Sequence, residues 1–228
     1  MDKNNEIKKL IETFHSEYTR NGEPIRINFR EIVTELSSTE RYSHLIHSYP
    51  AKLLCHIPYF FLQTDYFCPE NGVVLDPFCG TGTVMLEANI SGRNAKGADA
   101  NPLACLISKV KTTYIKKEDL QKTLGTIISR AKRFNTNECI DTSSVSRWFS
   151  KSTISQLWHL ECAIKKVRDT KQQDFFMMCL SNLVKKVSFA DPSISVPVKL
   201  NPERFAQNPE RMESAKFKLK TLENIDVY

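Results

Sequence analysis

The stretch VVLDPFCGTGTVMLEA, residues 73–88, determines the fold that we expect for this chain. Residues 72–78 form a short apolar run rich in β-branched side chains, which predicts a buried strand. A helix is predicted from about residue 83 to residue 91. Between them lie Gly80 and Gly82, which allow the backbone to bend sharply and to approach a ligand closely. The N–H groups at the start of the following helix favour a nucleotide or a carboxylate at this turn.

A second strand and a second helix follow the Gly turn. Residues 96–100 predict the strand and Pro102 opens the helix, an order that indicates the beginning of a doubly wound parallel sheet. Asp99 lies at the tip of the second strand, where an acid commonly accepts the hydroxyls of a ribose. No lysine follows the glycines as in a phosphate-binding loop, and Met85 occupies the third glycine position of a dinucleotide motif. The pattern favours an adenosine-type cofactor, while a tight turn without a ligand stays open.

Apolar periodicity predicts helices on both sides of this core. Ahead of it we expect helices over residues 7–14 and 29–36, the second capped by Asn28 with Glu31, and a third that Pro50 starts and Pro58 kinks or splits. Beyond it we expect helices over residues 120–131, 157–167 and 176–187. From residue 188 onward the apolar content drops and prolines punctuate a loop-like tail.

Composition and charge narrow the class of protein. The chain has 228 residues, 41% of them hydrophobic and 25% charged, which is typical of an ordinary globular protein of one or two domains. We expect it in the cytoplasm, because no stretch resembles a signal peptide or a membrane span. The net charge of +6 is uneven, with thirteen Lys or Arg against five acids in residues 107–168. This segment favours a polyanionic partner such as nucleic acid, although a solvated helix surface explains it equally well.

Cysteines and aromatic residues add two smaller expectations. The seven cysteines are scattered singly without a C-x-x-C pair, so we expect reduced, mostly buried thiols and no metal site. Trp148, Phe149 and Trp158 lie near basic residues and could stack on bases. For Trp158 the neighbouring apolar stripe favours packing in the core.

Three blocks in the same order carry a resemblance to a known family. The block D-P-F-C-G-T-G-T is followed by G-A-D-A-N-P-L-A and preceded by H-S-Y-P-A-K. Together they resemble the S-adenosylmethionine-binding half of prokaryotic amino-methylating DNA methyltransferases, of the cytosine-N4 or adenine-N6 type found in restriction-modification systems. The resemblance implies an α/β, Rossmann-like class I methyltransferase fold, S-adenosyl-L-methionine as cofactor and double-stranded DNA as partner. With H-S-Y-P-A-K ahead of D-P-F-C-G-T-G-T, the chain resembles the cytosine-N4 enzymes more closely, so the resemblance favours cytosine N4.

The resemblance also implies which residues bind the cofactor. One block is expected to cradle its methionine portion, an acid its ribose, a third segment its adenine, and a flanking block to close over it. In that order these residues are Asp76, Pro77, Phe78, Gly80, Gly82 and Thr83; Asp99; Ala100, Asn101 and Pro102; and His47, Tyr49, Pro50, Ala51 and Lys52. For His47 a structural hydrogen bond that anchors the loop is favoured over a catalytic role. Glu87, in the helix after the Gly turn, is expected to be solvated or to cap the helix.

A second block of this family, [DNS]-P-P-[YFW], is missing. Its polar group binds the exocyclic amine and its aromatic ring stacks on the flipped base. Asp191-Pro192-Ser193-Ile194 and Asn201-Pro202-Glu203-Arg204 both lack the second proline and the aromatic residue. We therefore identify no catalytic residue in the chain and expect a second chain or a missing half to carry this block, with the isolated chain inactive.

The expected domain plan follows from these patterns. Residues 1–40 form N-terminal helices, 41–115 the S-adenosylmethionine-binding βαβα core, 116–190 a helical region that is basic at its start, and 191–228 a loop-like tail leading to a missing C-terminal half. The sheet is expected to be incomplete and joined by added helices. Two alternatives stay open, namely an RNA methyltransferase and a non-catalytic nucleic-acid-binding scaffold.

Overall fold

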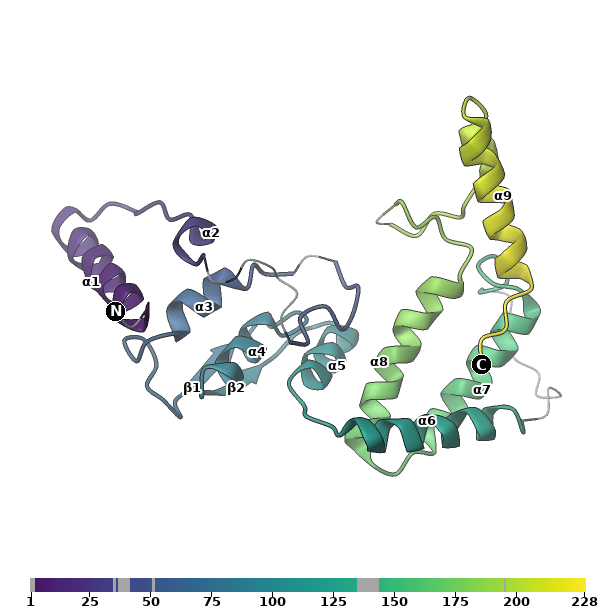
Figure 1. The fold of residues 1–228 in the computed structure, drawn as a ribbon, viewed down its shortest axis with the longest axis horizontal. Coiled ribbons are helices and arrows are strands. Elements are labelled where there is room, and N and C mark those ends of the chain that lie inside the picture. Colours follow the sequence, from purple (N-terminus) through teal and green to yellow (C-terminus); the bar gives the residue numbers. More distant parts are fainter. Residues whose placement is uncertain (1–2, 35, 37–41, 51, 135–143, 195) are drawn as a thin grey trace. The chain divides into compact units, whose positions relative to one another are not determined.

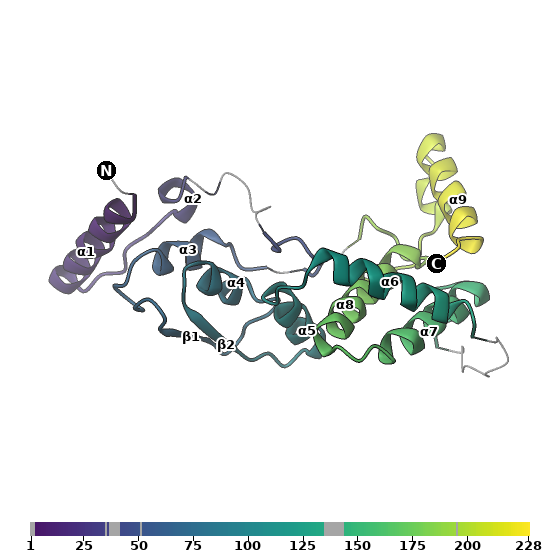
Figure 2. The same cartoon turned by 60° about the horizontal axis from the view of Figure 1, so that its bottom comes forward.

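The computed structural model describes residues 3–34, 36, 42–50, 52–134, 144–194 and 196–228. The chain divides into two compact units, Met1–Thr113 and Tyr114–Tyr228, which are described separately. Figures 1 and 2 show the helices and strands of both units. The first unit holds the sheet and the Gly turn, and the second unit is helical.

The core of the first unit has the predicted order of elements. It consists of β1 (Val73–Asp76), α4 (Thr83–Ile90), β2 (Asn94–Gly97) and α5 (Pro102–Lys111). The two strands pair in parallel, from Val73 opposite Asn94 to Asp76 opposite Gly97 (Figure 1). The second strand thus starts and ends earlier than the sequence pattern predicts. Within the described residues the sheet has these two strands, so the prediction of a small parallel sheet with added helices is confirmed.

Helices ahead of the sheet form an apolar cluster of their own. These helices are α1 (Lys3–Asn21), α2 (Phe29–Ile32) and α3 (His56–Leu62). The buried members of the cluster are Ile7, Ile11, Val33, Leu36, Cys55 and Phe60. Burial of a side chain of this size contributes about 1.5–3 kcal/mol, so the cluster fixes the three helices against one another.

One detail of these helices agrees with the expectation, and their boundaries differ from it. The capping pair is confirmed, because the Asn28 side chain accepts a hydrogen bond from the Arg30 N–H and donates one to Glu31, but α2 ends at Ile32. The prediction that Pro50 starts a helix is wrong, because α3 begins at His56. Pro58 then falls in the first turn, where a backbone N–H has no partner within the helix, and therefore neither kinks nor splits it.

Three helices build the core of the second unit, as predicted. They are α6 (Lys117–Ala131), α7 (Lys151–Lys165) and α8 (Thr170–Val187), and α7 contacts both of the others (Figure 2). Ser150 and Asp169 cap α7 and α8 with their side chains. The buried residues between the helices are Ile127, Ala131, Leu160, Ala163, Ile164 and Phe176. Trp158 is half-buried rather than fully packed in this core.

The prediction of a loop-like tail over residues 191–228 is wrong in part. It contains a short 3-10 helix, η1 (Pro202–Phe205), and a long helix, α9 (Pro209–Glu223). Asn201 and Asn208 cap these helices, and each following proline occupies a first-turn position. Proline is well suited to the first position of a helix, because its missing N–H would be unpaired there in any case. The prolines that indicate a loop therefore start helices instead.

Two further observations concern the chain as a whole. Among the helices of the described residues, none is both long and apolar enough to cross a membrane. Of the six cysteines described, only Cys55 and Cys79 are buried. The expectation of mostly buried thiols is therefore wrong, because the other four are only partly buried.

Candidate cofactor site

A pocket of about 690 Å³ lies where β1 ends and α4 begins. Five residues that the sequence analysis assigns to the cofactor line it, namely Lys52, Asp76, Phe78, Gly80 and Thr83. Five others that it did not assign also line it, namely Leu53, Leu75, Cys79, Thr81 and Val84. The volume falls in the range of ordinary small-ligand sites. The missed residues are sequence neighbours of the assigned ones, so adjacency is the signal that could have found them.

The two glycines of the turn have different tasks. Gly80 has φ +48°, and a Cβ built on it meets nothing within 4 Å, so the backbone there borders open space. Gly82 has φ +75°, and its Cβ would lie 2.3 Å from Ser108 Oγ in α5. Gly80 therefore leaves room for a ligand, whereas Gly82 allows α5 to approach the start of α4.

One carboxylate at the end of β1 and one just after β2 hold the turn. Asp76 at the end of β1 accepts a hydrogen bond from the Phe78 N–H at 3.1 Å. Asp99 accepts one from the Gly80 N–H at 2.9 Å and another from the Asn101 N–H at 2.8 Å. Each carboxylate oxygen of Asp99 retains a further lone pair that can accept a hydroxyl. The acid after β2 thus lies beside the Gly turn, with acceptor capacity left for a ligand.

The flanking block meets the same site from a distant part of the chain. The Asn101 side-chain amide donates to the Tyr49 hydroxyl at 2.8 Å. Lys52 Nζ donates to the backbone carbonyls of His44 at 3.2 Å and His47 at 2.7 Å. The imidazole of His47 is buried, and its assignment to a structural role stays a prediction. Three separate sequence blocks therefore converge on one pocket and its rim.

Other assigned residues lie outside the pocket lining. Pro50, Pro77, Ala100 and Pro102 are exposed, and Pro102 is the first residue of α5, which Asn101 caps through the Leu103 N–H. Ala51 lies outside the described residues. The assignment of these positions to the cofactor stays a prediction.

The prediction for Glu87 is wrong. This side chain is only 1% exposed, and its Oε1 lies 2.7 Å from His44 Nε2, which is also buried. The pair links α4 to the segment that carries Lys52. Nothing local in the sequence signals this contact, because the two residues are 43 positions apart.

Burial shifts the pKa of three groups around the site. The pKa of Lys52 is lowered by burial. The pKa of Lys111 falls to about 8, because the residue is buried and because the Lys52 ammonium repels its charge. Burial raises the pKa of the Cys79 thiol, and the carboxylates of Asp76 and Asp99 raise it further.

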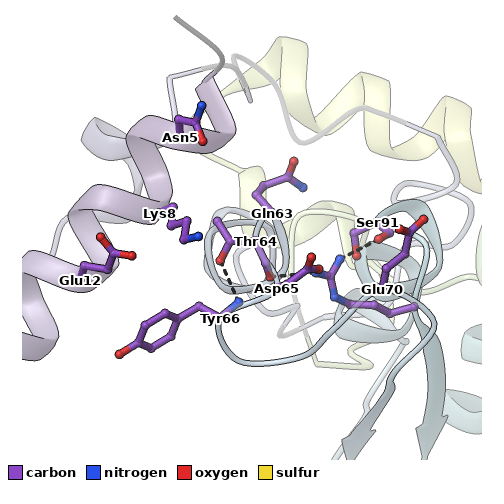
Figure 3. A pocket seen from close by; sticks show the side chains of 10 residues that line it. Asn5, Lys8, Glu12, Gln63, Thr64, Asp65, Tyr66, Glu70 and Ser91 are labelled. Atoms are coloured by element: carbon purple, nitrogen blue, oxygen red, sulfur yellow. Dashed lines mark hydrogen bonds and ion pairs between the residues drawn. The ribbon is translucent and has the colours of Figure 1, made fainter.

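A second pocket of about 600 Å³ lies between α1 and the segment after α3 (Figure 3). Arg93 is its buried cation, and its guanidinium donates to the carbonyls of Cys68, Thr64 and Ser91 and to Asp65. These bonds tie the start of β2 to the preceding loop. The arginine of this pocket is therefore engaged in holding the fold.

The Asp191-Pro192-Ser193-Ile194 segment of the second unit is also held internally. Asp191 accepts hydrogen bonds from the Ser193 N–H at 2.9 Å and from its hydroxyl at 2.6 Å. These bonds lower the pKa of Asp191, and Arg204 lies 3.6 Å from its other oxygen. The carboxylate is engaged within its own loop, which agrees with the view that this segment is not a base-binding block.

The fold and the site together indicate the class of protein. A Gly turn between a parallel strand and a helix, with an acid after the adjacent strand, is the arrangement of a nucleotide-cofactor-binding α/β unit. Residues 13–110 match the profile of the DNA methylase family of N6 and N4 methyltransferases. The resemblance to amino-methylating DNA methyltransferases of the restriction-modification kind is thereby confirmed.

Two curated relatives are similar to the chain. One is the type II methyltransferase M.MvaI of Kocuria varians, 28% identical over 162 residues, which cover 67% of this chain and 36% of that protein. The other is the type II methyltransferase M.MjaII of Methanocaldococcus jannaschii, 32% identical over 104 residues, which cover 45% of this chain and 19% of that protein. No solved structure matches the chain significantly. The matched region therefore spans about a third or less of each relative.

Proposed function

We propose that this chain is the S-adenosylmethionine-binding part of a site-specific DNA methyltransferase that methylates an exocyclic amine, with cytosine N4 favoured over adenine N6. The observation that carries the proposal is the convergence of the three blocks. Lys52 and Gly80 line one pocket, Asp99 bonds to Gly80, and Asn101 bonds to Tyr49. The similarity to two type II methyltransferases supports it.

The residues present fit this cofactor. The open space beside Gly80 admits a ligand against the backbone, and Asp99 has lone pairs left for the ribose hydroxyls. Lys52 supplies positive charge for the carboxylate of the methionine portion, and the exposed ring of Phe78 offers an apolar face to the adenosine. When bound, S-adenosylmethionine supplies an electrophilic methyl group. The residues of this chain bind and orient it, which is the positioning part of catalysis.

The base-binding block would come from another segment or chain. Within the described residues β1 pairs only with β2, and the carbonyls of Gly72 and Asp76 accept hydrogen bonds from that side. Because N–H and C=O groups of successive residues point to opposite edges, Val73 and Leu75 direct theirs to the free edge of β1. The side chains of Leu75 and Phe78 are 69% and 86% exposed. This edge suits a further strand that would extend the sheet beside the pocket.

A methyl-transfer assay tests the proposal. Labelled methyl transfer from S-adenosylmethionine to mixed-sequence duplex DNA is measured with this chain alone, and then with the polypeptide encoded immediately downstream. We expect transfer only in the mixture, and none when the chain carries Gly80→Arg. Transfer to RNA but not to DNA would favour the RNA methyltransferase. Cofactor-independent, salt-sensitive DNA binding without transfer would favour the scaffold.

The domain plan is part of the same proposal. Residues 41–115 are the cofactor-binding core, and residues 1–40 contribute the N-terminal helices α1 and α2. The helical region of residues 116–190 is a candidate for DNA contact, because it starts with basic residues. The cytoplasm is the compartment in which such an enzyme would meet its DNA.

A further inference from the structure

A buried lysine at the end of α5 has no hydrogen-bond partner for its ammonium in the described part of the chain. Lys111, the last residue of α5, is 4% exposed, and its Nζ makes no hydrogen bond there. A buried ammonium without a partner destabilises the fold, because the charge has lost its hydration and no hydrogen bond or ion pair compensates for the loss. Such a group is therefore unusual unless a ligand completes it.

Two contacts connect the end of α5 to the segments that carry the pocket residues. Its carbonyl accepts a hydrogen bond from Ser43 Oγ at 2.7 Å, which ties the end of α5 to the segment that carries His44 and Lys52. One turn earlier on the same helix, Ser108 lies against Gly82 at the start of α4. The end of α5 is thus fastened both to the flanking block and to the Gly turn.

Lys52 is the second cation of this region. It lines the pocket, and its ammonium is near enough to Lys111 to disfavour the charge there. Its own hydrogen bonds go to neutral carbonyls, so it lacks an anionic partner among the contacts that hold it. Two ammonium groups in a poorly solvated place attract an anion strongly, because the bound anion offsets the repulsion between them.

We propose that Lys111, together with Lys52, binds the carboxylate of the amino-acid portion of the cofactor. A carboxylate suits two ammonium groups, because its two oxygens can accept a hydrogen bond from each. A DNA phosphate does not suit a lysine that is 4% exposed, because the backbone of a duplex cannot enter the fold. This inference rests on the proposed function and adds a residue that none of the three sequence blocks contains.

Binding measurements with two ligands test the inference. The affinity of the full chain for S-adenosylmethionine and for its decarboxylated analogue is measured by calorimetry, for the unmodified protein, Lys111→Met and Lys111→Gln. Lys96→Met is the control, since Lys96 is an exposed lysine of β2 in the same unit. We expect both Lys111 variants to bind S-adenosylmethionine at least about tenfold more weakly, the effect of losing a charged hydrogen bond. Binding of the decarboxylated analogue should change less than about twofold, since the ligand has no group for Lys111.

Each other outcome overturns the inference in a distinguishable way. Equal losses for both ligands would make Lys111 a structural residue. Unchanged affinity for both, with weaker association of the downstream polypeptide, would assign Lys111 to a carboxylate side chain of that partner. If the unmodified chain binds neither ligand, the proposed function fails along with the inference. If it binds both ligands and the Lys111 variants bind them equally well, the inference alone fails.

Discussion

Replacement of Lys111 by methionine should stabilise the protein when no ligand is bound. In the folded state the pKa of Lys111 is about 8, against an ordinary value of 10.5. Because the folded pKa is the lower one, the unfolded chain holds the proton more tightly, and the charged lysine destabilises the fold below pH 8. With about 1.36 kcal/mol for each pKa unit, the penalty at neutral pH is about 3 kcal/mol.

The stability difference between Lys111→Met and the unmodified protein should decrease as the pH rises. Below pH 8 Lys111 is charged in both states, so the full penalty is present. Between pH 8 and 10.5 the folded state loses its proton first, the penalty shrinks, and the unmodified protein becomes relatively more stable. Lys111→Met should therefore raise the free energy of unfolding by up to about 3 kcal/mol at pH 7 and by less than about 1 kcal/mol at pH 10.

Urea unfolding followed by circular dichroism measures this difference at the two pH values. Lys96→Met, at an exposed lysine of β2, is the control, and it should change the free energy of unfolding by less than about 0.5 kcal/mol at either pH, as exposed substitutions generally do. A destabilised Lys111→Met variant at pH 7, or a difference that does not depend on pH, would refute the view that Lys111 is an unpaired buried cation.

Three further predictions concern the turn, the buried pair and the acid after β2. Gly82→Ala should lower the free energy of unfolding by about 2–4 kcal/mol in urea titrations, because the new Cβ meets Ser108 and the residue has positive φ, whereas Gly80→Ala has only the backbone cost. His44→Ala should cost about 3 kcal/mol in the same titrations, since it removes the imidazole partner of buried Glu87, and an undiminished stability would show that the pair is dispensable. Asp99→Asn should weaken binding of S-adenosylmethionine at least about tenfold in calorimetry, and equal affinity would remove Asp99 from the ribose site.

The sequence predicted those features that depend on neighbouring residues. The strand, Gly turn and helix around Gly80 follow from a contiguous pattern, and the helices of the second unit follow from apolar periodicity. Prolines were harder to interpret, because the same residue that breaks a helix interior also starts one. This ambiguity explains both the misplaced start of α3 and the missed α9.

Contacts between distant residues could not be predicted from local patterns. Glu87 reads as a solvated helix residue until the fold places His44 beside it, 43 positions away. Lys111 reads as an ordinary basic residue at the end of a helix, where cations are favoured anyway. Only the fold reveals that its ammonium is buried close to Lys52.

The central claim is that the pocket at the Gly80 turn binds S-adenosylmethionine, and calorimetric titration of the chain with this ligand tests it most directly. Three proteins are compared, namely the unmodified chain, Gly80→Arg and the control Gly125→Arg, whose glycine also has open space around it but lies in α6. The account predicts one bound ligand for the unmodified chain and for Gly125→Arg, and no detectable binding for Gly80→Arg. Unaltered binding by Gly80→Arg, or no binding by the unmodified chain, would contradict it.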